Sequence, residues 1–332
     1  MPQLSKRSKG DLGWRRRGRP FQISRAYAFQ RARQLDGSID EGPKYGSFCL
    51  SAHRVSTGWG AIAEHRWPYP RGKVDWPLTE PPGLDRIARF NRTLSHFRVR
   101  STDDCRRCLA GGVVFGFSIP ITQEWYTTRD GVIAMPSSPF LNQQHAVTAI
   151  GYDDSISQIA FLNSWGSHWG QSGIGHLPYD YFSQFASDAW FSWPMQPARY
   201  LPDSRDERFV GREMIAINTL GNAVGIVDVW DVSKDVRMGW CFMTLGPNGK
   251  FLEIEDYFLM REYYGTGNQR QLAKLVLDFA ESQGLPLRLW VPHADRRGRA
   301  ANFRNLNDFI RTARLKLRPS PHRWAAYIGE RY

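Results

Sequence analysis

The sequence predicts an α+β/α/β fold built from two modules. Three observations predict it. The chain has 332 residues, which is room for two domains at roughly 100–200 residues each. Apolar runs on both sides of the polar tetrad 152–155 are typical of a β-hairpin. Strand-like runs between 214 and 260 are followed by a helical period at 268–284.

The composition is that of a globular protein, with 42% apolar and 23% charged residues. We expect a basic arm over 1–20, a first module over 21–193, a Pro-containing polar linker over 194–205 and a second module over 206–332. No apolar run reaches the ~18 residues of a membrane span, and the N-terminus has no apolar segment of a secretory signal. We therefore expect a cytoplasmic protein with no membrane partner.

The net charge of +12 is concentrated in two segments. Residues 1–34 hold ten Lys and Arg against Asp11, and residues 288–323 hold ten against Asp295 and Asp308. Such segments can attract nucleic acid, a phosphorylated ligand or an acidic partner. The alternative is a solvated arm and the solvent face of a helix, and we favour it for the first segment.

The chain has four cysteines, Cys49, Cys105, Cys108 and Cys241, too few for a secreted disulfide scaffold of this length. Cys105 and Cys108 have zinc-knuckle spacing, but no second pair of ligands lies nearby in the sequence. We expect free thiols and no metal.

The first module begins with a predicted helix over 21–35, which has no interior Pro or Gly and is followed by Gly37. Small and β-branched residues predict a strand over 109–121. The runs 146–151 and 159–162 predict the two strands of the hairpin, with Asp and Ser supplying its turn.

Three side chains at one end of this hairpin indicate chemistry. His145 opens the first strand, and Asn163 follows the second, so the turn places them opposite each other. An Asn carbonyl can hold one imidazole nitrogen and leave the other to accept a proton from a nucleophile. Trp165 can cover that hydrogen bond.

The segment QQHAVTAIGYDDSISQIAFLNSWGSHWGQSGIGHLPYDYF resembles the His/Asn segment of papain-like cysteine peptidases. Upstream, LAGGVVFGFSI, WPYP and QISRAYAFQRARQLDGSIDEGPKYG resemble the bacterial members, so the likeness extends over residues 21–193. It implies that His145 is the catalytic base, that Asn163 orients it and that Trp165 covers the pair.

The family's nucleophilic cysteine has no counterpart here. It precedes the His by about 130–150 residues, which falls near or before residue 15, and residues 1–48 contain no cysteine. Cys49 aligns with a structural cysteine of the family, and Gln3 is not convincing as the oxyanion Gln. Without a thiolate no acyl-enzyme forms, so peptidase activity is not expected. The missing part of the fold is completed by residues 1–20 or by another polypeptide, or the true start lies upstream.

The second module has strand-like runs at 214–218, 224–230, 238–245 and 251–260, which predict an antiparallel meander. The turn at 246–249 is a hairpin signal. A helix over 268–284 and a strand over 286–291 follow.

A glycine loop between a strand and a helix leaves N–H groups and a helix dipole that favour an anion such as pyrophosphate. A simple tight turn is the alternative. With Asn302 before a short helix, the order of elements resembles GNAT acyltransferases. The resemblance implies an acyl-CoA site, for which we expect these residues: Phe258, Leu259, Met260, Gly265, Thr266, Gly267, Asn268 and Arg270.

Two departures from the GNAT pattern count against acyl transfer. Glu262 stands where the family has Gln or Arg and would repel phosphates, although Arg261 or Arg270 can compensate. Phe309 stands where a Tyr often protonates the leaving thiolate. Glu253 or Glu255 can act as a base.

We thus expect an acyl-CoA-dependent N-acyltransferase-like protein with acetyl-CoA or another acyl-CoA as cofactor. Its papain-like module would recognise a peptide or protein partner. One rival is a non-catalytic binding or assembly protein completed by a second chain. Another is a cysteine peptidase whose Cys-bearing segment lies outside this sequence.

Overall fold

The structure is a computed structural model. It describes residues 15–16, 19–20 and 22–331, except 43, 73–74, 195, 201–203, 206–208, 218–222, 232–235, 246–248, 265–266, 293–308, 312, 320 and 322–324. The chain divides into two compact units: unit 1 is Met1–Ile23, Ser47–Arg54 and Ser95–Ser192, and unit 2 is Ser24–Gly46, Val55–Leu94 and Trp193–Tyr332. These units group the chain differently from the linear modules expected above. Within the described residues, no helix is both long and apolar enough to cross a membrane.

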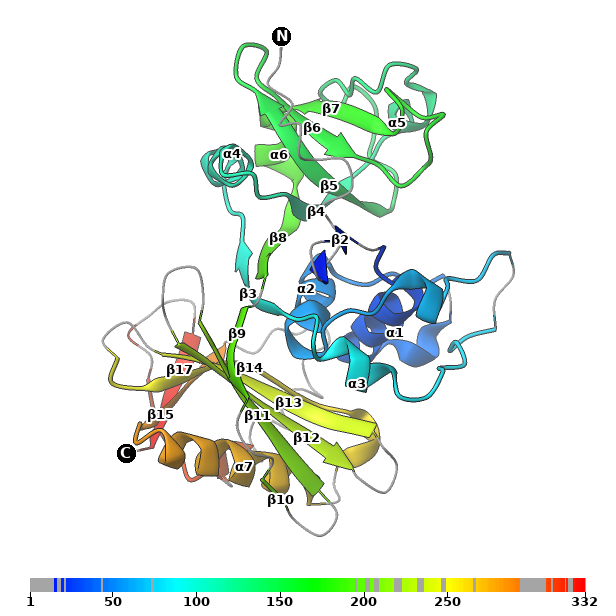
Figure 1. The fold of residues 1–332 in the computed structure, drawn as a ribbon. Helices are drawn as coiled ribbons and strands as arrows, with labels where there is room; N and C mark the ends of the chain where they lie inside the picture. The colour runs from blue at the N-terminus through cyan, green and yellow to red at the C-terminus, as the bar shows by residue number, and fades with distance from the viewer. Residues whose placement is uncertain are drawn as a thin grey trace. The chain divides into compact units, whose positions relative to one another are not determined.

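Unit 1 is built on a six-stranded sheet in the order β3-β8-β4-β5-β6-β7 (Figure 1). Its strands are β3 (Thr93–Arg98), β4 (Phe115–Pro120), β5 (Gln144–Asp153), β6 (Gln158–Leu162), β7 (Ile174–Pro178) and β8 (Ser187–Pro194). Its helices are α4 (Thr102–Ala110), α5 (Glu124–Thr127), α6 (Tyr179–Phe185) and the start of α2 (Cys49–Gly58). The strands β1 (Arg15–Arg16) and β2 (Arg19–Pro20) pair separately.

The core of unit 1 contains the inward side chains of β4, whose residues alternate between buried and partly exposed. The predicted hairpin is confirmed, since β5 and β6 pair from Thr148 to Asp153. Asp153 accepts from the N–H of Ser155 at 2.9 Å, as expected of Asp in a turn. The predicted strand over 109–121 was too long, because α4, which Ser101 caps at its start, continues to Ala110 and β4 begins only at Phe115.

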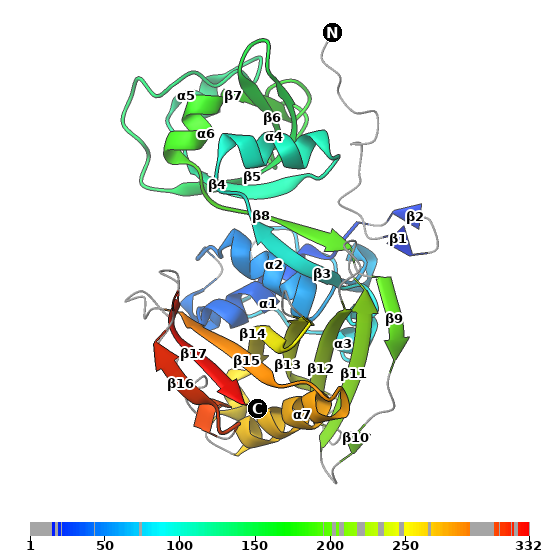
Figure 2. The same ribbon diagram turned by 90° about the vertical axis from the view of Figure 1, so that its left-hand side faces the viewer.

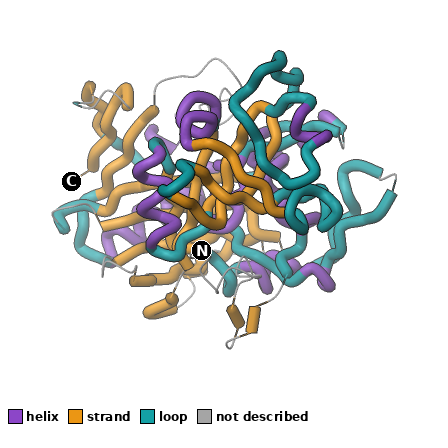
Figure 3. The backbone as a smooth tube through the Cα atoms, turned by 90° about the horizontal axis from the view of Figure 1, so that it is seen from above, coloured by secondary structure: helices purple, strands orange, loops and turns teal. Residues whose placement is uncertain are grey.

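Unit 2 contains the predicted first helix and most of the second module. The helix α1 (Arg25–Asp36) begins where Ser24 caps Tyr27 and ends at Gly37, with a φ of 69°, as expected. The short helices η1 (Ile39–Glu41), η2 (Glu64–Arg66) and α3 (Leu84–Ala88) follow in this unit. Figure 3 shows the helices of the chain in purple among its strands and loops.

The sheet of unit 2 has the order β10-β11-β12-β13-β14-β15-β17-β16, and β9 also pairs with β11. Its strands are β9 (Gln196–Tyr200), β10 (Ser204–Arg205), β11 (Phe209–Ile217), β12 (Ala223–Asp231), β13 (Val236–Leu245), β14 (Leu252–Leu259), β15 (Leu287–Pro292), β16 (Lys316–Pro319) and β17 (Ala325–Arg331). The predicted four-strand meander is confirmed as β11 to β14. The η3 turn (Arg261–Tyr263) and α7 (Asn268–Ser282) lie between β14 and β15.

The linker predicted over 194–205 is wrong in part, because β9 and β10 lie within it and pair with β11. Pro197 lies opposite Ala216 in the edge strand β9. An edge strand tolerates Pro because its N–H side needs no ladder partner. The Pro and polar content that suggests a linker therefore also fits an edge strand.

Candidate functional site

The candidate site lies at the open end of the β5–β6 hairpin in unit 1. His145 lies on β5 opposite Ile119 of β4, and Asn163 follows the last residue of β6. The imidazole Nε2 of His145 lies 2.9 Å from the side-chain Oδ1 of Asn163. The predicted contact between these two side chains is therefore confirmed, because the hairpin register brings positions 18 residues apart to one end.

Trp165 lies against the imidazole, with ring centroids 4.7 Å apart at 32°. It is half-buried and stacks on its other side with Tyr126 of α5, at 4.8 Å and 8°. Trp125, which is fully buried, meets His145 edge-on at 6.2 Å. Aromatic side chains therefore shield the His145–Asn163 hydrogen bond, as expected for Trp165.

The environment keeps His145 uncharged at neutral pH. Burial lowers the pKa of the imidazole, and the hydrogen bond that His145 donates to Asn163 acts in the opposite direction. With the proton on Nε2 directed to Asn163, the other ring nitrogen, Nδ1, carries a lone pair. That nitrogen can accept a proton from a nucleophile or a hydrogen bond from a bound amide.

Asn163 is itself fixed by the backbone. Its Oδ1 also accepts from the N–H of Ser164 at 2.8 Å, and its own N–H donates to the carbonyl of Gly173 at 2.8 Å. Its side-chain Nδ2 is buried and has no hydrogen-bond partner in the structure. The amide orientation is thus set by two donors to one oxygen, which holds the carbonyl towards His145.

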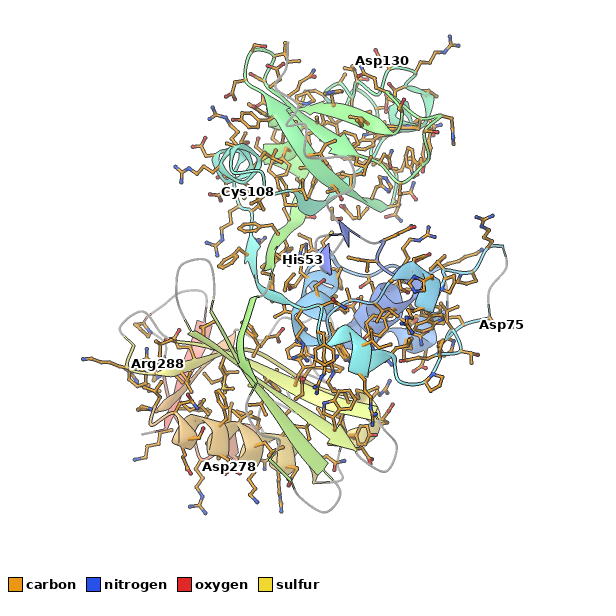
Figure 4. All side chains as sticks on the ribbon, viewed as in Figure 1. His53, Asp75, Cys108, Asp130, Asp278 and Arg288 are labelled. Carbon is orange, nitrogen blue, oxygen red and sulfur yellow. The ribbon has the colours of Figure 1, made fainter. Side chains whose placement is uncertain are left out.

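The four cysteines are free thiols, as predicted. Burial and the nearby Asp188 raise the pKa of Cys49 to about 12, and burial raises that of Cys105 to about 12. Burial also raises the pKa of Cys108, which lies on α4 (Figure 4), and that of Cys241. Within the described part of the chain, the side-chain partners of His145 are Asn163, Trp125 and Trp165, with no thiol among them.

The sequence of this part of the chain is similar to that of known proteins. The family model for papain family cysteine proteases matches residues 90–184. An uncharacterized peptidase C1-like protein of Acanthamoeba polyphaga mimivirus is 29% identical over 189 residues, which are 51% of this chain and 58% of the viral protein. The chain carries a papain-like cysteine peptidase (C1) domain. It spans little more than half the length of the viral relative.

Solved structures similar to this chain include two cysteine proteases. Xylellain of Xylella fastidiosa is 25% identical, and the match covers 54% of this chain and 72% of xylellain with a TM-score of 0.49. A cysteine protease of Carica candamarcensis is 18% identical, and the match covers 53% and 79% of the two chains with a TM-score of 0.38. The papain-like α+β fold accounts for about half of the chain, and the catalytic roles of its His145 and Asn163 stay predictions.

The aromatic partners of the papain-like site were missed by sequence reasoning. Trp125 and Tyr126 lie on the four-residue helix α5, between β4 and β5, where no periodic pattern marks them. The one signal was the adjacent pair of large aromatic residues in an otherwise polar segment after a strand. Such a pair is unusual in a solvated loop and can indicate packing against a site.

The residues expected to bind acyl-CoA lie around the end of β14 in unit 2. Phe258, Leu259 and Met260 are buried, and the first two pair with β13 through their backbone. The parallel partner of β14 on its other side is β15, and the two strands pair only from Leu252 to Ile254.

The helix that follows has a terminus that suits an anion only in part. Gly267, with a φ of 82°, is the N-cap of α7, and no side chain caps the helix. Asn268 is buried, and its Nδ2 donates to the carbonyl of Tyr263 at 3.3 Å, so its side chain has a structural contact. Arg270 is exposed in the first turn. Gly265 and Thr266 lie outside the described residues.

The other residues considered for acyl transfer have these surroundings. Glu253 is ion-paired with Arg288 at 3.1 Å (Figure 4 labels Arg288). Phe309 is buried and stacks on Tyr257 at 5.4 Å, as part of the core. Asn302 lies outside the described residues. Glu262 is exposed beside the loop, and Arg261 forms an ion pair with Asp40 at 3.5 Å.

No cluster of three or more metal-binding side chains occurs among the residues that the structure describes. Most of the basic segments 1–34 and 288–323 that suggested an anionic partner lie outside these residues or on α1 and β15. The nucleic-acid partner, the second chain and the cytoplasmic localisation therefore stay predictions.

Proposed function

We propose that this protein recognises peptides or proteins with its papain-like domain, at the site of His145 and Asn163. The observation that carries the proposal is the 2.9 Å contact between His145 Nε2 and Asn163 Oδ1 beneath Trp165. It holds one imidazole tautomer and leaves Nδ1 ready to accept a proton or a substrate N–H. Bound peptide would lie beside this nitrogen and the stacked Tyr126 and Trp165.

Hydrolysis at this site requires a thiolate, and the four cysteines described here are poor candidates. Their raised pKa values keep them as thiols at neutral pH, and a thiol is a weak nucleophile. In this proposal the chain binds peptides by itself. Cleavage would need a thiolate from a segment other than those that carry these cysteines.

A thiol-labelling experiment tests this point. A papain-directed epoxide at stoichiometric dose should leave Cys49, Cys105, Cys108 and Cys241 largely unmodified, by mass spectrometry. A mixed library of fluorescent peptides should still bind, and binding should weaken at least several-fold in His145→Ala but not in the control His176→Ala. Rapid labelling of Cys49 that is lost in His145→Ala would show that this chain is a peptidase. Equal peptide binding by both variants would reject the site.

A second function is favoured by the C-terminal sheet, which we propose to bind acyl-CoA in the manner of GNAT acyltransferases. The order of β14, the η3 turn, α7 and β15, in which β15 pairs in parallel with β14 from Leu252 to Ile254, supports it, because it matches the strand, loop, helix and strand of the resemblance. The uncapped N-terminus of α7, just past the end of β14, favours pyrophosphate. The core position of Phe309 favours binding over transfer.

Charge reversal tests the acyl-CoA proposal. Arg270→Glu puts a negative charge in the first turn of α7 and should weaken acetyl-CoA binding about tenfold or more, by calorimetry. Lys274→Glu is the matched control, since it makes the same charge change one turn further along α7 at another exposed position. The difference should shrink at high salt. A wild-type chain that gives neither heat nor a thermal shift with millimolar acetyl-CoA contradicts the proposal.

A further inference from the structure

The helical segment of unit 2 is too small to be stable by itself. Its helices α1 and α3 have 12 and five residues, and only the last turn of α2 belongs to this unit. Isolated helices shorter than about 12–15 residues are marginal in water, and they depend on tertiary packing. The buried side chains of this segment and of the C-terminal sheet form one continuous hydrophobic cluster, in which Tyr27, Val55, Trp59, Ile62 and Leu84 join Val227, Trp240 and Phe258.

The closest packing in this cluster involves Gly58. A Cβ atom at this position would lie 2.0 Å from Cε2 of the Trp240 ring, so any larger residue would collide with β13. The neighbouring Trp59 is fully buried and contacts Trp240 edge-on, with centroids 5.8 Å apart. The Trp59 ring also contacts Phe258 of β14 in a tilted arrangement, with ring centroids 4.7 Å apart. This shape complementarity is too specific for a loose contact.

Buried polar contacts cross the same face. Arg92 donates from Nη2 to Oδ1 of Asp228 on β12 at 2.5 Å, and the two side chains are 2% and 4% exposed. Arg237 of β13, fully buried, donates from Nη1 to the carbonyl of Gly58 at 2.9 Å. Burying an unpaired charge is costly, so these pairs require the helical segment and the sheet to meet in this register.

The sheet therefore has two covered faces. In Figures 1 and 2 the helix α7 lies along one face, and α1 and α3 lie on the other. The run from Arg237 to Met243 on β13 agrees, because its residues are all buried rather than alternating. We infer that the face of the C-terminal sheet formed by β12, β13 and β14 is the docking surface that completes the helical part of this unit, residues 24–46 and 55–94, within the same chain. This segment then needs no second polypeptide.

The full-length variant Gly58→Ala tests the inference with a clear sign. Alanine at the end of a helix ordinarily raises stability relative to glycine, and Gly58 has no left-handed φ. Here the clash with Trp240 should lower the melting temperature instead. Hydrogen exchange should show loss of protection in α1 and in β12 together. Gly46→Ala is the control, since a Cβ there meets no atom within 4 Å.

A second variant keeps the test valid if Gly58→Ala folds poorly. Trp240→Leu removes the ring that the new methyl meets, so Gly58→Ala should cost less in the Trp240→Leu background than in the wild type. A melting temperature raised by Gly58→Ala overturns the inference, and so does loss of protection confined to α2. Light scattering should show a monomer. A dimer whose dissociation removes the protection of α1 would assign the surface to a second copy and also overturn it.

Discussion

At the scale of single residues, the papain-like site depends on how His145 is held. Burial lowers its pKa, while the hydrogen bond that it donates to Asn163 raises it, so the two effects oppose each other. The folded-state pKa lies below the unfolded value of about 6.5. His145 therefore contributes stability above pH 6.5, and that contribution is lost as the pH falls through the folded-state pKa.

We expect Asn163→Ala to lower the pKa of His145 further, because the substitution removes the hydrogen bond that favours the charged ring. The measurement is an NMR titration of the imidazole Cε1–H signal. His176 is an internal control, since burial lowers its pKa while Asp130 and Asp153 raise it, and Asn163 is not among these causes. A His145 pKa that rises or stays unchanged in the variant would contradict the role of Asn163.

The sequence was sufficient to place these two residues because they belong to one hairpin. The side chains of each strand alternate with a period of two residues, and a single turn joins the strands. Together these two local features fix the pairing register of the hairpin. It could not place Trp125 and Tyr126, which reach the site from α5 through tertiary packing alone. The surroundings of the residues assigned to acyl-CoA were harder still to predict. The Asn268 side chain, for example, donates to the carbonyl of Tyr263, a contact that depends on the path of η3.

At the scale of elements, α2 has an unusual N-terminus. Asp188, which follows the first residue of β8, accepts from the N–H of Cys49 at 2.5 Å and from that of Leu50 at 3.2 Å. It also accepts from the indole N–H of Trp190 at 2.8 Å. A carboxylate at the first turn accepts hydrogen bonds from backbone N–H groups that have no partner within the helix. Its negative charge also interacts favourably with the helix dipole. The cap lies 139 residues from the helix that it stabilises, so no local signal in the sequence predicts it.

Asp188→Ala should therefore destabilise unit 1 by about 1–2 kcal/mol, the usual cost of losing a helix cap. The φ of 48° at this position adds to the loss, since Ala disfavours the left-handed region. Asp188→Asn is the matched control, because Asn keeps a side-chain oxygen and tolerates this backbone conformation. Urea denaturation measures both. Equal losses in the two variants would show that the cap is not the cause.

The same contrast explains the errors in element prediction. Helix α1 was predicted because its helical rhythm and its stop, Gly37, are local signals, although the predicted start at residue 21 was too early and the helix begins at Arg25 after its cap, Ser24. The strands β9 and β10 were not predicted because they belong to the sheet edge, where Pro and polar residues are tolerated. Local signals were sufficient where an element is stabilised locally, and they failed where a distant strand supplies the pairing.

At the scale of the whole molecule, sequence order and spatial grouping differ. The linear modules expected from the sequence place residues 24–94 with the papain-like domain, whereas the structure groups most of them with the C-terminal sheet. Such grouping rests on pairs far apart in the chain, such as Arg92 and Asp228, 136 residues apart. A pattern along one sequence does not show which two charged residues, far apart in the chain, form an ion pair.

The final prediction concerns this ion pair. In Arg92→Met, the ion pair that Asp228 keeps within the described part of the chain is the one with Arg237, whose Nη1 lies 3.5 Å from its Oδ1. Breaking a buried pair by removing one partner costs about 3–5 kcal/mol, because the remaining charge stays buried. Guanidinium denaturation should show this loss in a single transition followed by fluorescence of the buried Trp59 and Trp240. Arg86→Met is the control, since the same change at an exposed position should stay within about 0.5 kcal/mol. A loss below about 1 kcal/mol in Arg92→Met, or a sheet that unfolds separately from α1, would mean that the two parts are stable without each other.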